Sequence, residues 1–306
     1  MAYLHYNAIM KSTNATPLFN QKYPRGSQAF NDLVTQNVQL ALAEDIGDGD
    51  LTALLIPATQ LANATIISRE NAIICGQDWL NTCFLQLDKN AQIKWHVNEG
   101  DMVNANQLLC EINGNARGLL SAERCALNFL QTLSAVATHT REYVDAIGSA
   151  NSLICDTRKT LPGMRLAQKY AVTVGGGANQ RLALYDGILI KENHIKAAGG
   201  ISAALQAALV LASRASNSIT TQIEVENLDE LQQALEAGAS SILLDNFTLN
   251  QMRAAVTLNN GRALLEASGN VNLETVRDIA ETGVDRISIG SLTKNIRAID
   301  LSMRIK

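Results

Sequence analysis

The chain has 306 residues, of which 47% are hydrophobic and 18% are charged, a balance typical of a folded globular protein and not of a disordered one. Its 25 basic and 29 acidic residues give a formal net charge of −4, so we expect neither a nucleic-acid partner nor an anionic membrane partner. The five cysteines show no CxxC spacing, which argues against a disulfide framework or a structural zinc site.

The N-terminal residues show no basic segment followed by an apolar stretch, the pattern of a secretory signal. The longest uncharged helical-looking run, residues 201–213, is too short to cross a bilayer. We therefore expect a cytoplasmic protein.

The first half of the chain begins with a polar, irregular stretch over residues 1–28, which we expect to be a weakly ordered arm. Apolar residues at helical spacing then predict a helix over 30–43, followed by an acidic, glycine-rich turn over 44–50. Short apolar runs predict a small β-rich region, with strands at 64–68, 72–75 and 93–96 and hairpins over 99–115. A long helical pattern returns from 119 to 147.

The second half has a different rhythm, in which short apolar runs end in a polar residue or glycine and helical stretches separate them. Continuous apolar runs are typical of buried parallel strands, and here they cover 153–155, 187–190, 223–225, 242–244, 264–267 and 287–289. The residues that follow them recur at intervals of about 21 to 33 residues, the period of successive strand–helix units. We predict a parallel α/β barrel with its site at the carboxyl ends of the strands; an open doubly wound sheet is the alternative.

The residues at these strand ends change in type along the chain. Basic residues come first, two carboxylates follow, and small residues close the series: Arg158, Lys159, Arg165, Lys169, Arg181 and Lys191, then Glu224 and Asp245, then Ser268, Gly269, Asn270, Gly290 and Ser291. Arginines bind carboxylates bidentately, carboxylates suit Mg²⁺, and late glycine-containing barrel loops suit phosphate. The series predicts a site for polyanionic substrates and a divalent metal.

Single members of this series also have simpler interpretations. Arg158 and Lys159 alone resemble a solvated pair, and Lys169 reads as a helix-surface residue. The glycines at 175–177 alone suggest a flexible loop, and His194 suggests a structural cap. The series is more persuasive than its members, because independent surface charges have no reason to follow the strand period.

Two long stretches closely resemble the quinolinate phosphoribosyltransferase family. They are TRKTLPGMRLAQKYAVTVGGGANQRLALYDGILIKENHI, residues 157–195, and LEASGNVNLETVRDIAETGVDRISIGSLTK, residues 265–294. Shorter matches support them: EDIGDGDLT at 44–52, SAERCALNFL at 121–130, EVEN at 224–227 and LLDNF at 243–247.

The resemblance implies transfer of a phosphoribosyl group from phosphoribosyl pyrophosphate to quinolinate, with release of pyrophosphate and CO2. The product would be nicotinate mononucleotide for NAD biosynthesis, and the cofactor would be Mg²⁺. The implied domains are an N-terminal α/β sandwich over 29–135, a barrel of fewer than eight strands over 136–290, and a C-terminal helix over 291–306 that packs back on the N-terminal domain.

The resemblance also implies a homodimer with shared active sites, in which Arg124 reaches the site of the neighbouring subunit. Carried over by position, Arg158, Lys159, Arg181 and Lys191 line the quinolinate pocket. Glu224 and Asp245 face the ribose and the Mg²⁺-bound pyrophosphate, with Lys159, Lys191, Glu224 and Asp245 as the catalytic set. The resemblance implies that phosphate is bound by Ser268, Gly269, Gly290 and Lys294.

One position departs from the family pattern, which usually has His-Arg after the glycine run where this chain has Gln180-Arg181. We assign Gln180 to the substrate pocket too, because glutamine donates a hydrogen bond although it carries no charge. If the family histidine only donates a hydrogen bond, Gln180 preserves function; if it must be cationic, activity falls.

Three other interpretations remain from the sequence. Lys191 at a strand end could form a Schiff base in a barrel lyase. The chain could be a diverged paralogue of the same fold, associated with molybdenum transport, and Gln180 keeps that alternative open. The turn-rich stretch at 99–114 has the rhythm of a biotinyl- or lipoyl-carrier hairpin, but no lysine lies between Lys94 and Lys159 to carry the group.

Overall fold

A computed structural model describes residues 16–214 and 219–306 and divides the chain into two compact units. The first unit is built mainly from residues 142–159 and 177–290, and the second from residues 19–141, 160–176 and 291–306. The chain therefore passes between the units several times, and the units are described separately below.

The first unit contains one six-stranded parallel sheet in the order β6-β11-β10-β9-β8-β7. Its strands are β6 (Leu153–Cys155), β7 (Gly187–Ile190), β8 (Thr220–Val225), β9 (Ser241–Asp245), β10 (Leu264–Ser268) and β11 (Arg286–Ser288). Each contains or overlaps one of the apolar runs from which a strand was predicted. Buried side chains such as Ile223, Ile242 and Ala267, all 0% exposed, explain why these strands appear as continuous apolar runs.

The strand order is cyclic, and this separates a barrel from a doubly wound sheet. Strands β7 to β11 lie side by side in chain order and β6 completes the series next to β11, so no reversal of order occurs. Residue 178 fills the position beside the free edge of β6, where Ala178 N–H donates to Ile154 O at 2.8 Å. The barrel prediction is confirmed.

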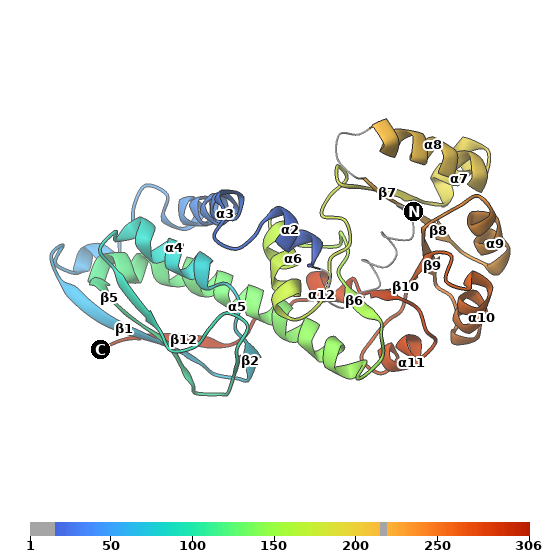
Figure 1. Cartoon of the computed structure of the whole chain (residues 1–306). Helices are drawn as coiled ribbons and strands as arrows, with labels where there is room; N and C mark the ends of the chain where they lie inside the picture. The colour runs from blue at the N-terminus through green and yellow to red at the C-terminus, as the bar shows by residue number, and fades with distance from the viewer. Residues whose placement is uncertain (1–15, 215–218) are drawn as a thin grey trace. The chain divides into compact units, whose positions relative to one another are not determined.

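Helices follow the strands and lie on the outside of the sheet (Figure 1). They are α7 (Glu192–Ala198), α8 (Ile201–Arg214), α9 (Leu228–Glu236), α10 (Leu249–Asn259) and α11 (Val276–Ala280). Helices α9 and α10 begin at capping side chains: Asn227 accepts from Glu230 N–H and Thr248 from Gln251 N–H. Each cap fixes the residue at which the helix begins, and so it also fixes the last residue of the loop that joins β8 to α9 or β9 to α10.

The second unit is built on an antiparallel sheet in the order β12-β1-β5-β3, with β2 and β4 paired separately. Its strands are β1 (Leu61–Ser68), β2 (Ala72–Ile73), β3 (Gln92–Trp95), β4 (Met102–Val103), β5 (Leu108–Asn115) and β12 (Leu301–Ile305). Its helices are α2 (Leu18–Lys22), α3 (Gln28–Ile46), the 3₁₀ turn η1 (Ala53–Leu55), α4 (Gln77–Leu87), α5 (Ala116–Ala146), α6 (Arg165–Val174) and α12 (Ser291–Lys294). Phe19, Phe30, Trp79 and Tyr170 form its aromatic core.

Three expectations about this unit are wrong. Residues 16–28 of the expected arm contain α2, whose Phe19 is fully buried; residues 1–15 lie outside the described part. The C-terminal segment is not a helix beyond α12: β12 pairs antiparallel with β1, because apolar residues alternate from Ile299 to Ile305 as in a strand. The domains are not contiguous either, since residues 160–176 belong to the second unit.

The glycine run at 175–177 is a packing contact and not only a loop. A Cβ atom on Gly175 would lie 2.5 Å from Ala137 O and 2.7 Å from Thr140 Cβ on α5. Helix α6 therefore ends where only a glycine fits against α5. Lys169 on α6 is 0% exposed, so its assignment to a helix surface is also wrong.

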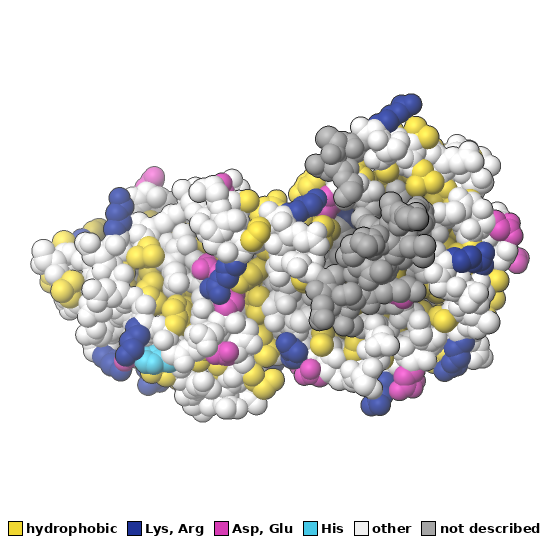
Figure 2. Space-filling model, viewed as in Figure 1, with side chains coloured by type: hydrophobic (Ala, Val, Ile, Leu, Met, Phe, Trp, Pro, Cys, Tyr) yellow, Lys and Arg dark blue, Asp and Glu magenta, His cyan; other side chains and the backbone are white. Residues whose placement is uncertain are grey.

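On the visible face of each unit, basic and acidic side chains are interspersed among apolar and neutral ones (Figure 2). In the described residues no single helix has the length and apolar character to span a membrane, and only α7 and α8 taken together, bent by 95°, meet that condition.

Candidate active site

The carboxyl ends of β7 and β8 bring two predicted site residues into direct contact. Lys191 follows β7 and Glu224 lies in β8, and Lys191 Nζ is 2.7 Å from Glu224 Oε2. The side chain of Glu224 is only 11% exposed, whereas that of Lys191 is 44% exposed. Two residues that the sequence analysis placed at successive strand ends therefore form an ion pair.

The next strands continue the same edge. Ser268 at the end of β10 lies in register with Asp245 on β9 and with Ser288 on β11. Asn246 follows Asp245, and its side-chain amide donates to Asp245 Oδ2 at 3.0 Å. Acidic and small residues thus occupy neighbouring strand ends, as the period in the sequence predicts.

A close approach of backbones joins the loops after β9 and β10. Gly269 has φ +102°, and a Cβ atom there would lie 2.1 Å from Asn246 Oδ1. Both the positive φ and the absence of a side chain are therefore required at this position. The loops after β9 and β10 therefore pack closely against each other.

Arg158 and Arg181 are close enough to repel each other. Burial lowers the pKa of Arg181 below its ordinary value, and the charge of Arg158 lowers this pKa further, while Asp186 opposes both effects. Among the residues that the structure describes, Arg158 Nε is buried and has no hydrogen-bond partner. Two half-buried guanidinium groups in this state form a site for an anion.

Buried carboxylates hold the segment that carries Arg181. Asp156, 0% exposed, accepts from Gln180 N–H at 2.9 Å and from Asn179 Nδ2 at 2.7 Å. Asp186 accepts from Leu182 N–H and Ala183 N–H, both at 2.8 Å. The backbone on both sides of Arg181 is therefore fixed by hydrogen bonds to charged acceptors.

Arg181 itself is anchored at one of its guanidinium nitrogens. Its Nη1 donates to Gly187 O at 2.9 Å, at the start of β7. A guanidinium group has five N–H donors, so this single bond orients the side chain and leaves further donors for a ligand.

Sequence reasoning missed a polar cluster in the barrel interior. Glu266 on β10 is 1% exposed, and it accepts hydrogen bonds from Gln180 Nε2, from Gln222 Nε2 at 3.1 Å and from Ser288 Oγ at 2.5 Å. The signal was visible in the sequence, because a glutamate inside an otherwise apolar buried strand needs partners.

Lys159 and Gly290 lie side by side at the ends of the first and last strands. A Cβ atom on Gly290 would lie 3.1 Å from Lys159 Cδ. Lys159 N–H donates to Thr157 Oγ1 at 3.0 Å, which orients the loop after β6. The side chain of Lys159 therefore packs against Gly290, where a larger residue would displace it.

Two predicted site residues belong to the second unit. Arg124 lies exposed on α5, and Lys294 ends α12 and is also exposed. His194, which we interpreted as a cap, does serve as one: Lys191 N–H donates to His194 Nδ1 at 3.0 Å at the start of α7.

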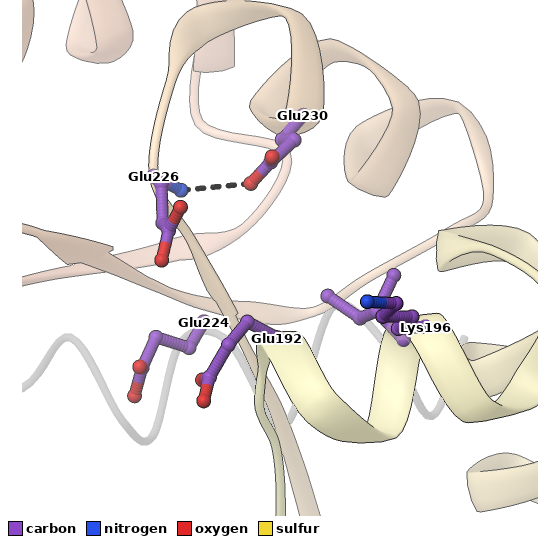
Figure 3. A pocket seen from close by; sticks show the side chains of 6 residues that line it. Glu192, Lys196, Glu224, Glu226 and Glu230 are labelled. Atoms are coloured by element: carbon purple, nitrogen blue, oxygen red, sulfur yellow. Dashed lines mark hydrogen bonds between the residues drawn. The ribbon is translucent and has the colours of Figure 1, made fainter.

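An acidic cavity of about 140 Å³ opens beside Glu224. It is lined by Glu192, Ile195, Lys196, Glu224, Glu226 and Glu230, and Figure 3 shows the side chains of Glu192 and Glu224 directed the same way from α7 and β8. Neither Arg158 nor Arg181 lines this cavity. The arginine pair, and not this cavity, has the chemistry for an anionic substrate.

The described residues contain no group of three or more His, Cys, Asp or Glu side chains that could hold a metal ion alone. Mg²⁺, however, usually keeps several waters and binds through one or two carboxylates plus substrate phosphates. Glu224 and Asp245, on neighbouring strands, fit that mode.

Two family models match the chain. The C-terminal domain of quinolinate phosphoribosyl transferase matches residues 136–304, and the N-terminal domain of the same family matches residues 50–134.

Among curated proteins, the chain is 40% identical over 262 residues to a probable nicotinate-nucleotide pyrophosphorylase (carboxylating) of Bacillus subtilis, covering 86% of this chain and 90% of that one. It is 39% identical over 285 residues to quinolinate phosphoribosyltransferase (decarboxylating) 2, mitochondrial, of Nicotiana glauca, covering 88% and 81%. Among solved structures, the nicotinate-nucleotide pyrophosphorylase from Francisella tularensis superposes with a TM-score of 0.86 at 48% identity, covering 90% and 97%.

Proposed function

This chain belongs to the quinolinate phosphoribosyl transferase family, and we infer from this that it catalyses the decarboxylating reaction for which its relatives are named. Quinolinate receives the phosphoribosyl group of phosphoribosyl pyrophosphate, and the products are nicotinate mononucleotide, pyrophosphate and CO2. The reaction supplies a pyridine nucleotide for NAD biosynthesis.

The observation that carries this assignment is the pair of mutually repelling arginines. Burial, and then repulsion from Arg158, lowers the pKa of Arg181, and within the described part of the chain Arg158 Nε is buried without a hydrogen-bond acceptor. A ligand with two adjacent carboxylates neutralises both charges and supplies the missing acceptor. Quinolinate has two such carboxylates, whereas nicotinate has one.

The bond changes require no covalent nucleophile on the protein. The pyridine nitrogen attacks the anomeric carbon of the donor, and the carbon–oxygen bond to pyrophosphate breaks. The carboxylate next to the nitrogen then leaves as CO2, and the electron pair that it leaves on the ring carbon is stabilised by the positive ring nitrogen and takes up a proton. Orienting two anions for this attack removes much of the entropic barrier.

The remaining strand-end residues complete the proposal. Glu224 and Asp245 stabilise positive charge that develops on the ribose, and they would hold Mg²⁺ through water or directly. When bound, the metal would supply positive charge for the pyrophosphate leaving group. Ser268, Gly269, Gly290 and Lys294 bind phosphate, and Lys159 and Lys191 neutralise the quinolinate carboxylate before it departs. The ion pair of Lys191 with Glu224 supports this role rather than a Schiff base.

We further propose that the active protein is a homodimer in which Arg124 of each subunit completes the site of the other. Its position on the exposed face of α5 supports this, because an exposed arginine can reach a substrate held by another chain. A cytoplasmic location without nucleic-acid or membrane partners fits the small net negative charge.

The direct test is the formation of nicotinate mononucleotide from quinolinate, phosphoribosyl pyrophosphate and Mg²⁺, with nicotinate as the control acceptor. Product from quinolinate alone is the expected result. A folded protein that forms no product with either acceptor would refute the assignment and favour the diverged paralogue.

A further inference from the structure

The side chain of Gln180 points into the barrel interior. Its Nε2 donates to Glu266 Oε2 and, at 3.1 Å, to Gln222 Oε1. A primary amide has two hydrogens on its nitrogen, so both donors of Gln180 already have acceptors on β8 and β10. The expectation that Gln180 donates a hydrogen bond to the substrate has no support in this geometry.

The neighbouring groups fix which way the amide faces. The carboxylate of Glu266 only accepts, so the nitrogen of Gln180, and not its oxygen, must face it. Gln222 Nε2 also donates to Glu266 Oε2 at 3.1 Å, which closes a ring of three side chains. Ser288 Oγ binds the other carboxylate oxygen at 2.5 Å.

The oxygen of the Gln180 amide connects this ring to Arg181. Gln180 Oε1 accepts from the N–H of Arg181 at 3.2 Å. A continuous path of hydrogen bonds therefore runs from Glu266 through the Gln180 side chain to the backbone of Arg181. This path ends at the backbone of the residue whose guanidinium group we assign to the anion site.

We propose that Gln180 is a positioning residue, which holds Arg181 in register with Arg158 by binding the buried carboxylate of Glu266, and that it makes no direct hydrogen bond to the substrate. The proposal rests on the proposed function, because its readout is the affinity for quinolinate. It explains how glutamine can replace a histidine here: the position needs a donor toward Glu266 and no positive charge.

Replacing Gln180 by a carboxylate residue distinguishes a positioning role from direct contact with the substrate. Gln180→Glu places two carboxyl groups together, and such a pair binds a proton more tightly than either group alone. The KM for quinolinate should then rise with pH, by about fivefold or more between about pH 6 and pH 8, as the shared proton is lost. Other charged groups nearby are Arg286, the register neighbour of Glu266 on β11, and Asp156, which accepts from the Gln180 backbone.

The double variant Gln180→Glu/Glu266→Gln reverses donor and acceptor and keeps one carboxylate. Under the proposal it restores the quinolinate KM and its pH profile to within about threefold of the parent protein. If Gln180 donated to the substrate, a carboxylate at 180 would repel quinolinate in both variants and no rescue would occur. Absence of rescue in a folded double variant would therefore overturn the proposal.

Two further variants control for folding and for the substitution itself. Gln232→Glu makes the same chemical change beside Glu236 on α9, where Gln232 Nε2 donates to Glu236 Oε1 at 2.5 Å, and it should leave the quinolinate KM unchanged. Gln222→Met removes one partner of Gln180, and it should raise the KM for quinolinate but not for the donor. If either variant at 180 fails to fold, as judged by circular dichroism, an unchanged quinolinate KM in Gln222→Met would refute the proposal.

The parent protein distinguishes this proposal from the proposed function. If the parent forms no nicotinate mononucleotide, the function itself fails and the variants carry no meaning for catalysis. If the parent is active and the double variant is not rescued, only the positioning role fails.

Discussion

Replacing Arg158 by alanine tests the dicarboxylate clamp most directly. A hydrogen bond to a charged group contributes about 1.5–3 kcal/mol, and each 1.4 kcal/mol is about tenfold in affinity. The variant should therefore raise the KM for quinolinate about 10- to 150-fold. The lower end is the better expectation, because Arg181 remains to bind the anion and the variant no longer has the repulsion between the two arginines.

The same reasoning predicts the KM for the donor and the thermal stability of Arg158→Ala. The KM for phosphoribosyl pyrophosphate should change little, because we assign the phosphates to other strand ends. The thermal midpoint without substrate should not fall, since the substitution removes one of two like charges, whereas the rise in midpoint on adding quinolinate should be lost.

Steady-state kinetics with each substrate varied in turn, alongside thermal unfolding, gives all of these quantities. Arg253→Ala on the outer helix α10, which removes an exposed arginine, is the matched control and should behave as the parent. Equal losses for quinolinate and donor would refute a clamp specific for the dicarboxylate.

Three further predictions concern other parts of the chain. Arg124→Ala mixed with Glu224→Ala should recover activity in heterodimers with one intact site; no recovery after demonstrated subunit exchange would contradict a shared site. Gly269→Ala should destabilise the protein by about 1–3 kcal/mol, because its Cβ atom would meet Asn246 Oδ1, and an unchanged unfolding midpoint in denaturant would contradict the close packing. Hydrogen bonds from Ser121 and then from Ala53 N–H lower the pKa of Asp50 below its ordinary value of 3.8. This carboxylate therefore stabilises the fold above pH 3.8, and its contribution is lost as the pH falls through the lower pKa of the folded state. Ser121→Ala should weaken this dependence of the thermal midpoint on acid, and an identical pH profile in the variant would show that the hydrogen bond does not contribute.

The barrel was predictable from sequence because its strands are buried on both faces. Runs such as Ile242–Leu244 have no polar residue to obscure the pattern, and the helices between them set a regular spacing. Lys191 and Glu224 were expected at one edge of the sheet for the same reason, since parallel strands bring their carboxyl ends together. Their ion pair was not predicted.

The elements that escaped prediction lacked such local signals or had competing ones. Helix α4 begins after Gly76, whose side chain can form no cap, and its short pattern was not recognised. The strand β12 forms by pairing with β1, which lies near the other end of the chain. Its alternation from Ile299 to Ile305 was nevertheless a usable sign.

Side-chain roles were harder to predict than elements. Lys169 was expected at a helix surface because lysine is rarely buried, although apolar residues such as Ala167, Tyr170 and Val172 flank it in α6 and are buried with it. Gln180 finds its acceptor on Glu266, 86 residues away, and no local pattern connects a loop amide to a carboxylate on a distant strand. Sequence reasoning could assign Gln180 to the site but not to the interior of the barrel.

The interleaved course of the chain limits how this protein can be divided. A C-terminal fragment that begins near residue 136, where the family domains meet, would contain β12 and α6. The N-terminal fragment would then lack β12, the strand that pairs with β1. Cutting the chain once therefore exposes the edge of a sheet instead of releasing an independent barrel. Expression of the two halves as separate polypeptides should yield soluble protein only when both are produced together, as in a split-protein complementation system.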